Sequence, residues 1–95
     1  MTVSGNTATV QVSGEVDAGE LVDASLAALR DGATNVVVDF QQVTFIDSAG
    51  LGALIEIHRE ASIKWGAVTI RNPPPMLVRL LQITLLDEVL EVEQT

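Results

Sequence analysis

The sequence predicts an α/β fold in which a mixed sheet of four to five strands is packed by about three to four helices. Segments with the two-residue period of strands alternate with segments of helical period, in the order strand, strand, helix, strand, helix, strand, helix and a final short strand. Val36, Val37 and Val38 form a β-branched run, which is typical of a central strand with both faces covered. Helices between strands imply crossover connections, so part of the sheet is expected to be parallel.

The first half of the chain predicts two strands and one helix. Residues 7–12 alternate small polar and apolar side chains, which is the pattern of a half-buried strand. A Gly-Asn turn precedes them, so Thr2–Ser4 is expected to pair back as a very short edge strand. Asp17 stands where a helix N-cap belongs. The helix after it has one apolar face, made of Leu21, Val22, Leu26 and Leu29.

The second half predicts two further strand–helix units and a short final strand. Residues 35–40 form the central strand, and a short connection leads to a helix whose apolar positions are Leu54, Ile55 and, in part, His58 and Ala61. Residues 67–71 have the pattern of the next strand. Three consecutive prolines then interrupt regular structure, and a third helix begins at the last proline or at Met76. Residues 89–92 are expected to form the final strand.

The composition fits a single globular domain over residues 1–95 and limits its partners. The net charge is −8 and the five basic residues are scattered, whereas nucleic-acid binding requires clustered Lys and Arg. No stretch approaches the ~20 apolar residues that span a bilayer, and an acidic surface is repelled by anionic lipids. The chain has no cysteine, which excludes disulfides, thiolate metal sites and a cysteine nucleophile. We expect a cytoplasmic protein that inserts in no membrane, needs no cofactor and binds a protein or a small ligand.

One segment has an unusual composition, namely Asp47, Ser48, Ala49, Gly50, Leu51 and Gly52. It places two glycines in the first turn of a helix, where each costs ~1 kcal/mol relative to alanine. Glycine there lets a partner chain, a phosphate or a neighbouring strand approach the backbone. Ser48 lies beside the first amides of the helix, where the helix dipole favours negative charge. The residues alone also allow a plainer interpretation, in which Ser48 or Asp47 is only a cap and the glycines only permit tight packing.

The same segment, taken over residues 45–54, resembles the signature of the STAS domain family in its anti-sigma factor antagonist branch. That signature has a hydrophobic pair, then Asp-Ser, then Ser, Thr or Ala, then Gly-Leu-Gly. Residues 12–17 resemble the family's Gly-Glu-Val-Asp element, and residues 36–40 resemble the strand before its signature loop. Residues 80–87 resemble the family's last helix. The resemblance covers nearly the entire chain in the expected order.

The resemblance implies a STAS-like fold and a switch operated by phosphorylation. In the family, the unphosphorylated form binds an anti-sigma factor and frees the sigma factor. An anti-sigma factor kinase then phosphorylates the serine after the motif's aspartate, which releases the partner, and a phosphatase resets the switch. The matching phosphoacceptor here is Ser48. The implied partner-binding residues are Asp17, Asp47, Ser48, Ala49, Gly50, Leu51 and Gly52.

Other assignments remain open or are disfavoured by particular residues. A STAS accessory subunit of a membrane transporter assembly, or of another signalling complex, is the main alternative, and weak self-association is also open. A serine hydrolase is disfavoured because Ile46 stands where the nucleophile elbow needs glycine. A metal site is not expected, since His58 is the only histidine. The single tryptophan, Trp65, fits a partner contact and helix-end packing equally well.

Overall fold

The computed structural model describes residues 1–94 and contains one five-stranded mixed sheet, which confirms the predicted fold class. The strands follow one another across the sheet in chain order, with β1 antiparallel to β2 and all later neighbours parallel. The strands are β1 (Thr2–Ser4), β2 (Thr7–Glu15), β3 (Asn35–Phe45), β4 (Val68–Arg71) and β5 (Glu91–Glu93). The connecting elements are the helices α1 (Ala18–Arg30), α2 (Ser48–Ile63) and α3 (Pro75–Ile83) and the 3₁₀ turn η1 (Leu86–Glu88).

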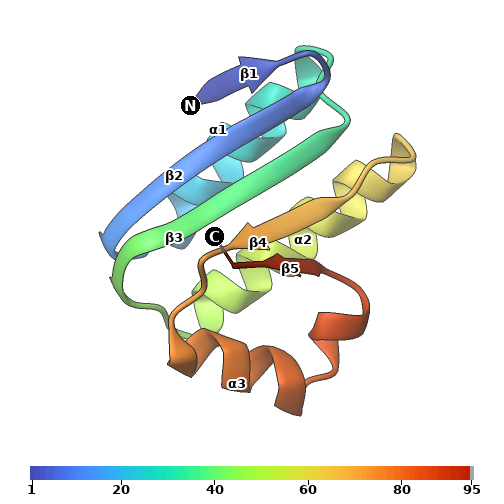
Figure 1. Cartoon of the computed structure of the whole chain (residues 1–95). Coiled ribbons are helices and arrows are strands. Elements are labelled where there is room, and N and C mark those ends of the chain that lie inside the picture. Colours follow the sequence, from blue (N-terminus) through green and yellow to red (C-terminus); the bar gives the residue numbers. More distant parts are fainter. Residues whose placement is uncertain (95) are drawn as a thin grey trace.

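Helices cover one face of the sheet, not both. Each helical crossover steps to the next strand in the same direction, and crossovers of the usual right hand then place their helices on the same side. In Figure 1, α1 and α2 lie behind the sheet. Val36 and Val38 face these helices and are fully buried, whereas Val37 points to the open face. Val37 is nevertheless buried, because Thr9 and Thr69 flank it on the neighbouring strands.

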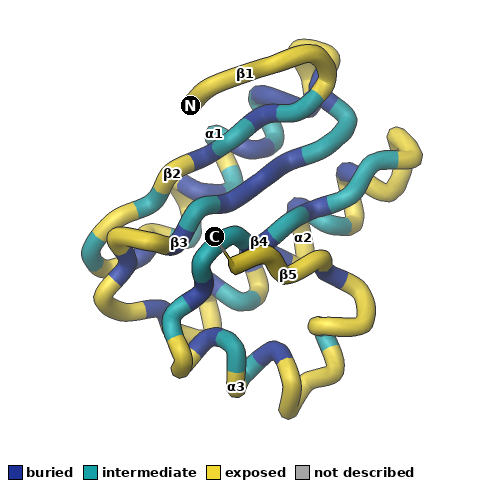
Figure 2. Tube along the Cα trace, viewed as in Figure 1, coloured by how far each residue is buried: buried dark blue, intermediate teal, exposed yellow. Residues whose placement is uncertain are grey.

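The core lies between the sheet and the helices and consists mainly of aliphatic side chains. Figure 2 shows the buried stretches along the central strands and the exposed edge strands β1 and β5. The largest fully buried side chains are Leu21, Val36, Val38, Phe40, Ile46, Leu54, Ile57, Val68, Ile70, Leu77 and Leu81. This aliphatic packing fixes the end of β3 and the start of α2. Residues 47–52, the segment of unusual composition, lie at that junction.

The buried face of α2 differs from the predicted one. Ile55, which the periodicity places in the core, is 37% exposed, whereas Ile57 is fully buried. The helix packs largely through small residues, since its buried positions are Gly50, Ala53, Leu54, Ile57 and Ala61. Small side chains allow a close approach but contribute little hydrophobic signal, so periodicity alone misplaces this face.

The buried face of α1 contains an unpaired hydroxyl. Leu21 and Leu29 are buried as predicted, while Val22 and Leu26 are only half-buried. Ser25 takes a fully buried position between them, and its hydroxyl has no hydrogen-bond partner among the described residues. A buried polar group without a partner costs about 1–3 kcal/mol.

We expect Ser25→Ala to raise the free energy of unfolding by about 1 kcal/mol, because the change removes the unpaired hydroxyl and adds the helix propensity of alanine. Urea unfolding followed by circular dichroism measures the difference. Ser62→Ala is the control, since the exposed Ser62 hydroxyl already donates a 2.8 Å hydrogen bond to the His58 carbonyl, and it should change stability little. A loss of stability in Ser25→Ala would contradict the unpaired state of this hydroxyl.

Candidate functional site

The ends of β2 and β3 bring two helix starts together. Because these strands are parallel, their carboxyl ends reach the same edge of the sheet. The Val16 amide donates to the Phe45 carbonyl across 3.1 Å, which joins the loop before α1 to the loop before α2. Asp17 and Asp47 therefore lie at neighbouring helix N-termini.

Both aspartates cap their helices. Asp17 Oδ1 accepts a hydrogen bond from the Glu20 amide at 3.0 Å, and Asp47 Oδ1 accepts one from the Gly50 amide at 3.2 Å. Each bond satisfies an amide that has no partner within its helix. Asp17 and Asp47 are therefore the N-caps of α1 and α2, and Ser48 does not act as a cap.

Ser48 is the first residue of α2 and is exposed. None of the described residues forms a hydrogen bond with its hydroxyl, so Oγ is open to a second molecule. The Leu51 amide makes the first intrahelical bond, to the Asp47 carbonyl at 3.2 Å, and the amides of Ser48 and Ala49 lie ahead of it. These amides and the helix dipole favour a negative group at this point.

The two glycines of the first turn have different roles. A Cβ atom on Gly50 would lie 2.5 Å from Ile46 Cγ1, so only glycine lets the buried Ile46 side chain fit beneath α2. A Cβ atom on Gly52 would meet nothing within 4 Å. The described fold therefore does not require glycine at this second position, where it costs the helix ~1 kcal/mol. The exposed Gly52 backbone is accessible to a molecule outside the fold.

Two exposed apolar side chains within seven residues of Ser48 in the sequence were not predicted to be exposed. Phe45 is 46% exposed, and Ile55 lies seven residues after Ser48, on the same side of α2. Consecutive side chains of an extended segment point to opposite sides, so Phe45 faces away from the core that Ile46 enters. The sequence does not predict the exposure of Ile55, because that exposure depends on how α2 is rotated about its own axis.

A shallow groove of about 340 Å³ runs between the N-terminal halves of α1 and α2. Gly19, Ala49 and Gly52 give it a smooth lining, and Asp23 and Glu56 contribute negative charge. Because Ala49 directly follows Ser48, the groove continues the surface on which the serine hydroxyl lies.

The structure brings the predicted site residues to one end of α2 but differs in their exposure. The exposed members are Asp17, Asp47, Ser48, Ala49 and Gly52. Leu51 is half-buried, and Gly50 is buried, so Gly50 shapes the site from below and is not part of its surface. We use the name Ser48 face for the exposed residues at the end of β3 and along the Ser48 side of α2, namely Phe45, Asp47, Ser48, Ala49, Gly52 and Ile55.

Trp65 and His58 lie outside the Ser48 face. Trp65 is 97% exposed and follows the C-terminal end of α2, whereas Ser48 begins that helix. His58 is half-buried along α2, where its Nε2 is 3.4 Å from Ser62 Oγ. Within residues 1–94, no three acidic or histidine side chains gather as a metal site would require, and none of the helices has the length and apolar character of a membrane span.

Known proteins share both the sequence pattern and the fold. A family model described as "Mlab, STAS domain" matches residues 2–91. The anti-sigma-B factor antagonist of Bacillus subtilis (strain 168) is 24% identical over 85 residues, which cover 87% of this chain and 78% of that protein.

Solved structures have the same arrangement of strands and helices. An anti-sigma factor antagonist from Mycobacterium paratuberculosis gives a TM-score of 0.75 at 28% identity, covering 99% of this chain and 82% of that one. The phosphorylated form of the Bacillus cell fate determinant SpoIIAA gives a TM-score of 0.80 at 24% identity, with coverages of 97% and 86%. Since the family match extends over residues 2–91, this chain belongs to the STAS domain family.

Proposed function

We propose that this chain is an anti-sigma factor antagonist that binds its partner through the Ser48 face. In its unphosphorylated form it binds an anti-sigma factor with serine kinase activity, and this contact frees the sigma factor. The observation that carries the proposal is the exposed Ser48 hydroxyl, which has no hydrogen-bond partner among the described residues and stands at the start of α2. Relatives named as anti-sigma factor antagonists support it.

The unmodified Ser48 face has the properties of a protein contact. Phe45 and Ile55 present apolar side chains, and burial of apolar surface contributes roughly 25 cal/mol per Å². In the groove beside the serine, Ala49 and Gly52 carry almost no side chain, so the backbone of a partner can come close. The Ser48 hydroxyl is uncharged, and a partner group that hydrogen-bonds it removes the cost of covering it.

Phosphorylation of Ser48 makes the same surface unfavourable for partner binding. The kinase transfers the γ-phosphoryl group of ATP to Ser48 Oγ, the hydroxyl proton passes to a base of the kinase, and ADP leaves. The phosphate adds about −1.5 to −2 charges, which the amides of Ser48 and Ala49 stabilise at the helix start. A partner that covered this group would desolvate it beside the Asp47 carboxylate, at high cost. The partner therefore dissociates, and a phosphatase restores binding by hydrolysing the phosphate ester.

In this proposal the chain is a substrate of its partner and not itself an enzyme. No base among the described residues lies within hydrogen-bond reach of the Ser48 hydroxyl. Asp47, the acid beside it in sequence, is engaged as the cap of α2. The serine is thus available as an acceptor without being activated as a nucleophile by its own chain.

Substitutions at Ser48 separate the two states of the switch. Ser48→Ala should bind the anti-sigma factor with little change and accept no phosphate, whereas Ser48→Glu should bind at least about tenfold more weakly, a loss of about 1.4 kcal/mol. Titration calorimetry with candidate anti-sigma kinases measures the affinities, and intact-mass spectrometry after incubation with ATP locates the phosphate.

Ser62→Glu is the matched control, because it adds the same charge at an exposed position near the other end of α2. It should leave the affinity unchanged. Equal binding by Ser48→Ala and Ser48→Glu, or phosphate on a different residue, would contradict the proposal. Capture of a transporter ATPase in place of an anti-sigma factor would assign the Ser48 face to a membrane transporter assembly.

Gly52→Ala tests whether glycine at this position is required for partner binding and not for the stability of the fold. We expect the free energy of unfolding to rise by up to ~1 kcal/mol, because alanine is the better helix former and meets no neighbour. Affinity for the anti-sigma factor should fall at the same time. Gly50→Ala should instead lower stability by about 1–3 kcal/mol through its clash with Ile46. A Gly52→Ala variant with unchanged affinity would show that the partner does not approach this backbone.

A further inference from the structure

The turn between α2 and β4 holds a tryptophan in a backbone conformation that favours glycine. Trp65 has a φ of 61°, in the left-handed region, where a bulky side chain is rare. The Trp65 amide donates to the Ser62 carbonyl at 3.0 Å, and the Gly66 amide donates to the Ala61 carbonyl at 2.9 Å. These two bonds form a Schellman motif, in which the left-handed position is usually glycine. Tryptophan therefore makes this helix end less stable than glycine would.

The Trp65 side chain gains no packing that would offset this cost. It is 97% exposed, and the neighbouring apolar side chain of Ile63 is 70% exposed. This exposure excludes packing against the helix end, which is one of the two interpretations that the sequence allows. Large exposed aromatic side chains are typical of protein contacts, where tryptophan is among the residues that contribute most of the binding energy.

The turn holds Trp65 rigidly at the end of α2 that is far from the junction with β3 (Figure 1). Lys64 Nζ donates a hydrogen bond to the Leu29 carbonyl, which ties the turn to the end of α1. Gly66 lies so close to the Thr34 carbonyl that no Cβ atom fits between them. An apolar side chain on a fixed backbone loses little conformational entropy when it binds another molecule.

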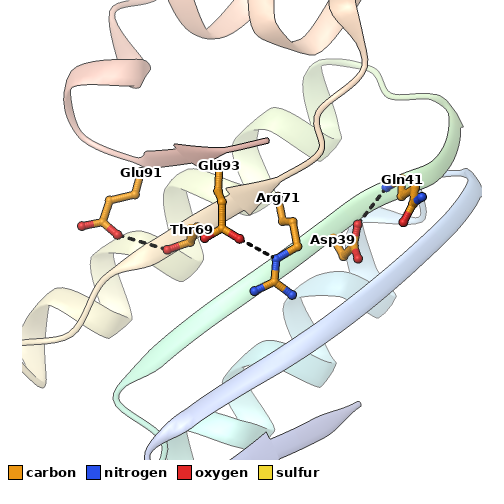
Figure 3. A network of polar contacts seen from close by, with 6 residues as sticks. All are labelled: Asp39, Gln41, Thr69, Arg71, Glu91 and Glu93. Atoms are coloured by element: carbon orange, nitrogen blue, oxygen red, sulfur yellow. Dashed lines mark hydrogen bonds and ion pairs between the residues drawn. The ribbon is translucent and has the colours of Figure 1, made fainter. Parts of the chain in front are cut away.

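The charged residues beside this turn have both signs and are unpaired among the described residues. Four exposed charged side chains lie at or near the C-terminal ends of the two helices, namely Arg30, Asp31, Arg59 and Glu60. Within residues 1–94, Arg71 of β4 pairs with Glu93 of β5 at 2.9 Å (Figure 3), whereas these four form no ion pair. We use the name Trp65 end for these four residues together with Ile63, Lys64 and Trp65.

Self-association is the contact that these mixed charges favour. When two copies meet across a two-fold axis, each cation can face an acid of the other copy, so mixed charges complement themselves. The net charge of −8 opposes association, but the acidic group near the start of α2 is distant, namely Glu15, Asp17, Glu20 and Asp47. The 16-residue helix α2 separates it from the Trp65 end by about 24 Å. This is about three Debye lengths at physiological ionic strength, so the repulsion is screened.

A second group of exposed apolar side chains lacks this complementarity. It consists of Ile83, Leu85 and Val89. Residues 83–89 carry two negative charges and no positive one, so two copies of this group would repel each other. The Trp65 end is therefore the exposed apolar surface that fits a second copy.

We propose that two copies of this chain associate through their Trp65 ends, with the two tryptophans packed against each other across a two-fold axis. Offset stacking suits a pair of indole rings, and Arg59 of each copy is available to the indole or to Glu60 of the other. A large aromatic side chain buries about 150–250 Å², so two tryptophans and two isoleucines cover less than the ~1,200 Å² of a standard interface. The dimer is therefore weak and depends on protein concentration. Its two Ser48 faces lie away from the contact and stay free to bind a partner.

Sedimentation velocity of the full chain from about 0.01 to 1 mM tests the proposal. We expect the average mass to rise from that of one chain, 10.1 kDa, towards twice that value. Trp65 is the only tryptophan, so the fluorescence emission should shift to shorter wavelength over the same concentrations, as water leaves the indole.

Trp65→Gly separates association from folding. It should weaken association at least about tenfold, whereas its urea midpoint should rise, because glycine suits a φ of 61°. Leu85→Gly is the matched control, since Leu85 also has a φ of 61° and is 61% exposed. It should raise the urea midpoint in the same way and associate like the unmodified chain.

A chain that stays monomeric at about 1 mM, or equal association by Trp65→Gly and Leu85→Gly, would overturn the proposal. Weaker association of Ser48→Glu would also overturn it, because that result places the second copy on the Ser48 face. A monomeric chain whose affinity for the anti-sigma factor falls in Trp65→Gly would overturn it in favour of that partner. None of the expected results depends on phosphorylation of Ser48, so the phosphorylation switch stands or falls separately.

Discussion

The Ser48 face depends on one close contact, between the Ile46 side chain and the Gly50 backbone. Ile46 is buried, and it approaches Gly50 so closely that no β-carbon fits between them. Together with the Asp47 cap on the Gly50 amide, this contact fixes where α2 begins and how its first turn is rotated. With that rotation, Ile57 faces the core and Ser48 faces outward. The accessibility of the serine is therefore a consequence of the packing beneath it.

The exposed part of the face has features that the isolated domain does not need. Gly52 lowers the helix propensity of α2, and Phe45 and Ile55 expose apolar surface that a core would otherwise bury. Places where a natural sequence breaks a local rule of stability are expected to be functional or strained sites. Gly52 and Ile55 share one side of α2 with Ser48, where an added charge would oppose the contact that they favour.

Much of this arrangement could be predicted from the sequence, and the exceptions have physical causes. Strand alternation located β1 and β2, and capping chemistry located Asp17, because both signals are local. The rotation of α2 is not a local property, since small buried residues set it, and periodicity therefore places Ile55 in the core. The separate roles of Gly50 and Gly52 follow only when the position of Ile46 is known. The single covered face of the sheet likewise depends on the handedness of three successive crossovers.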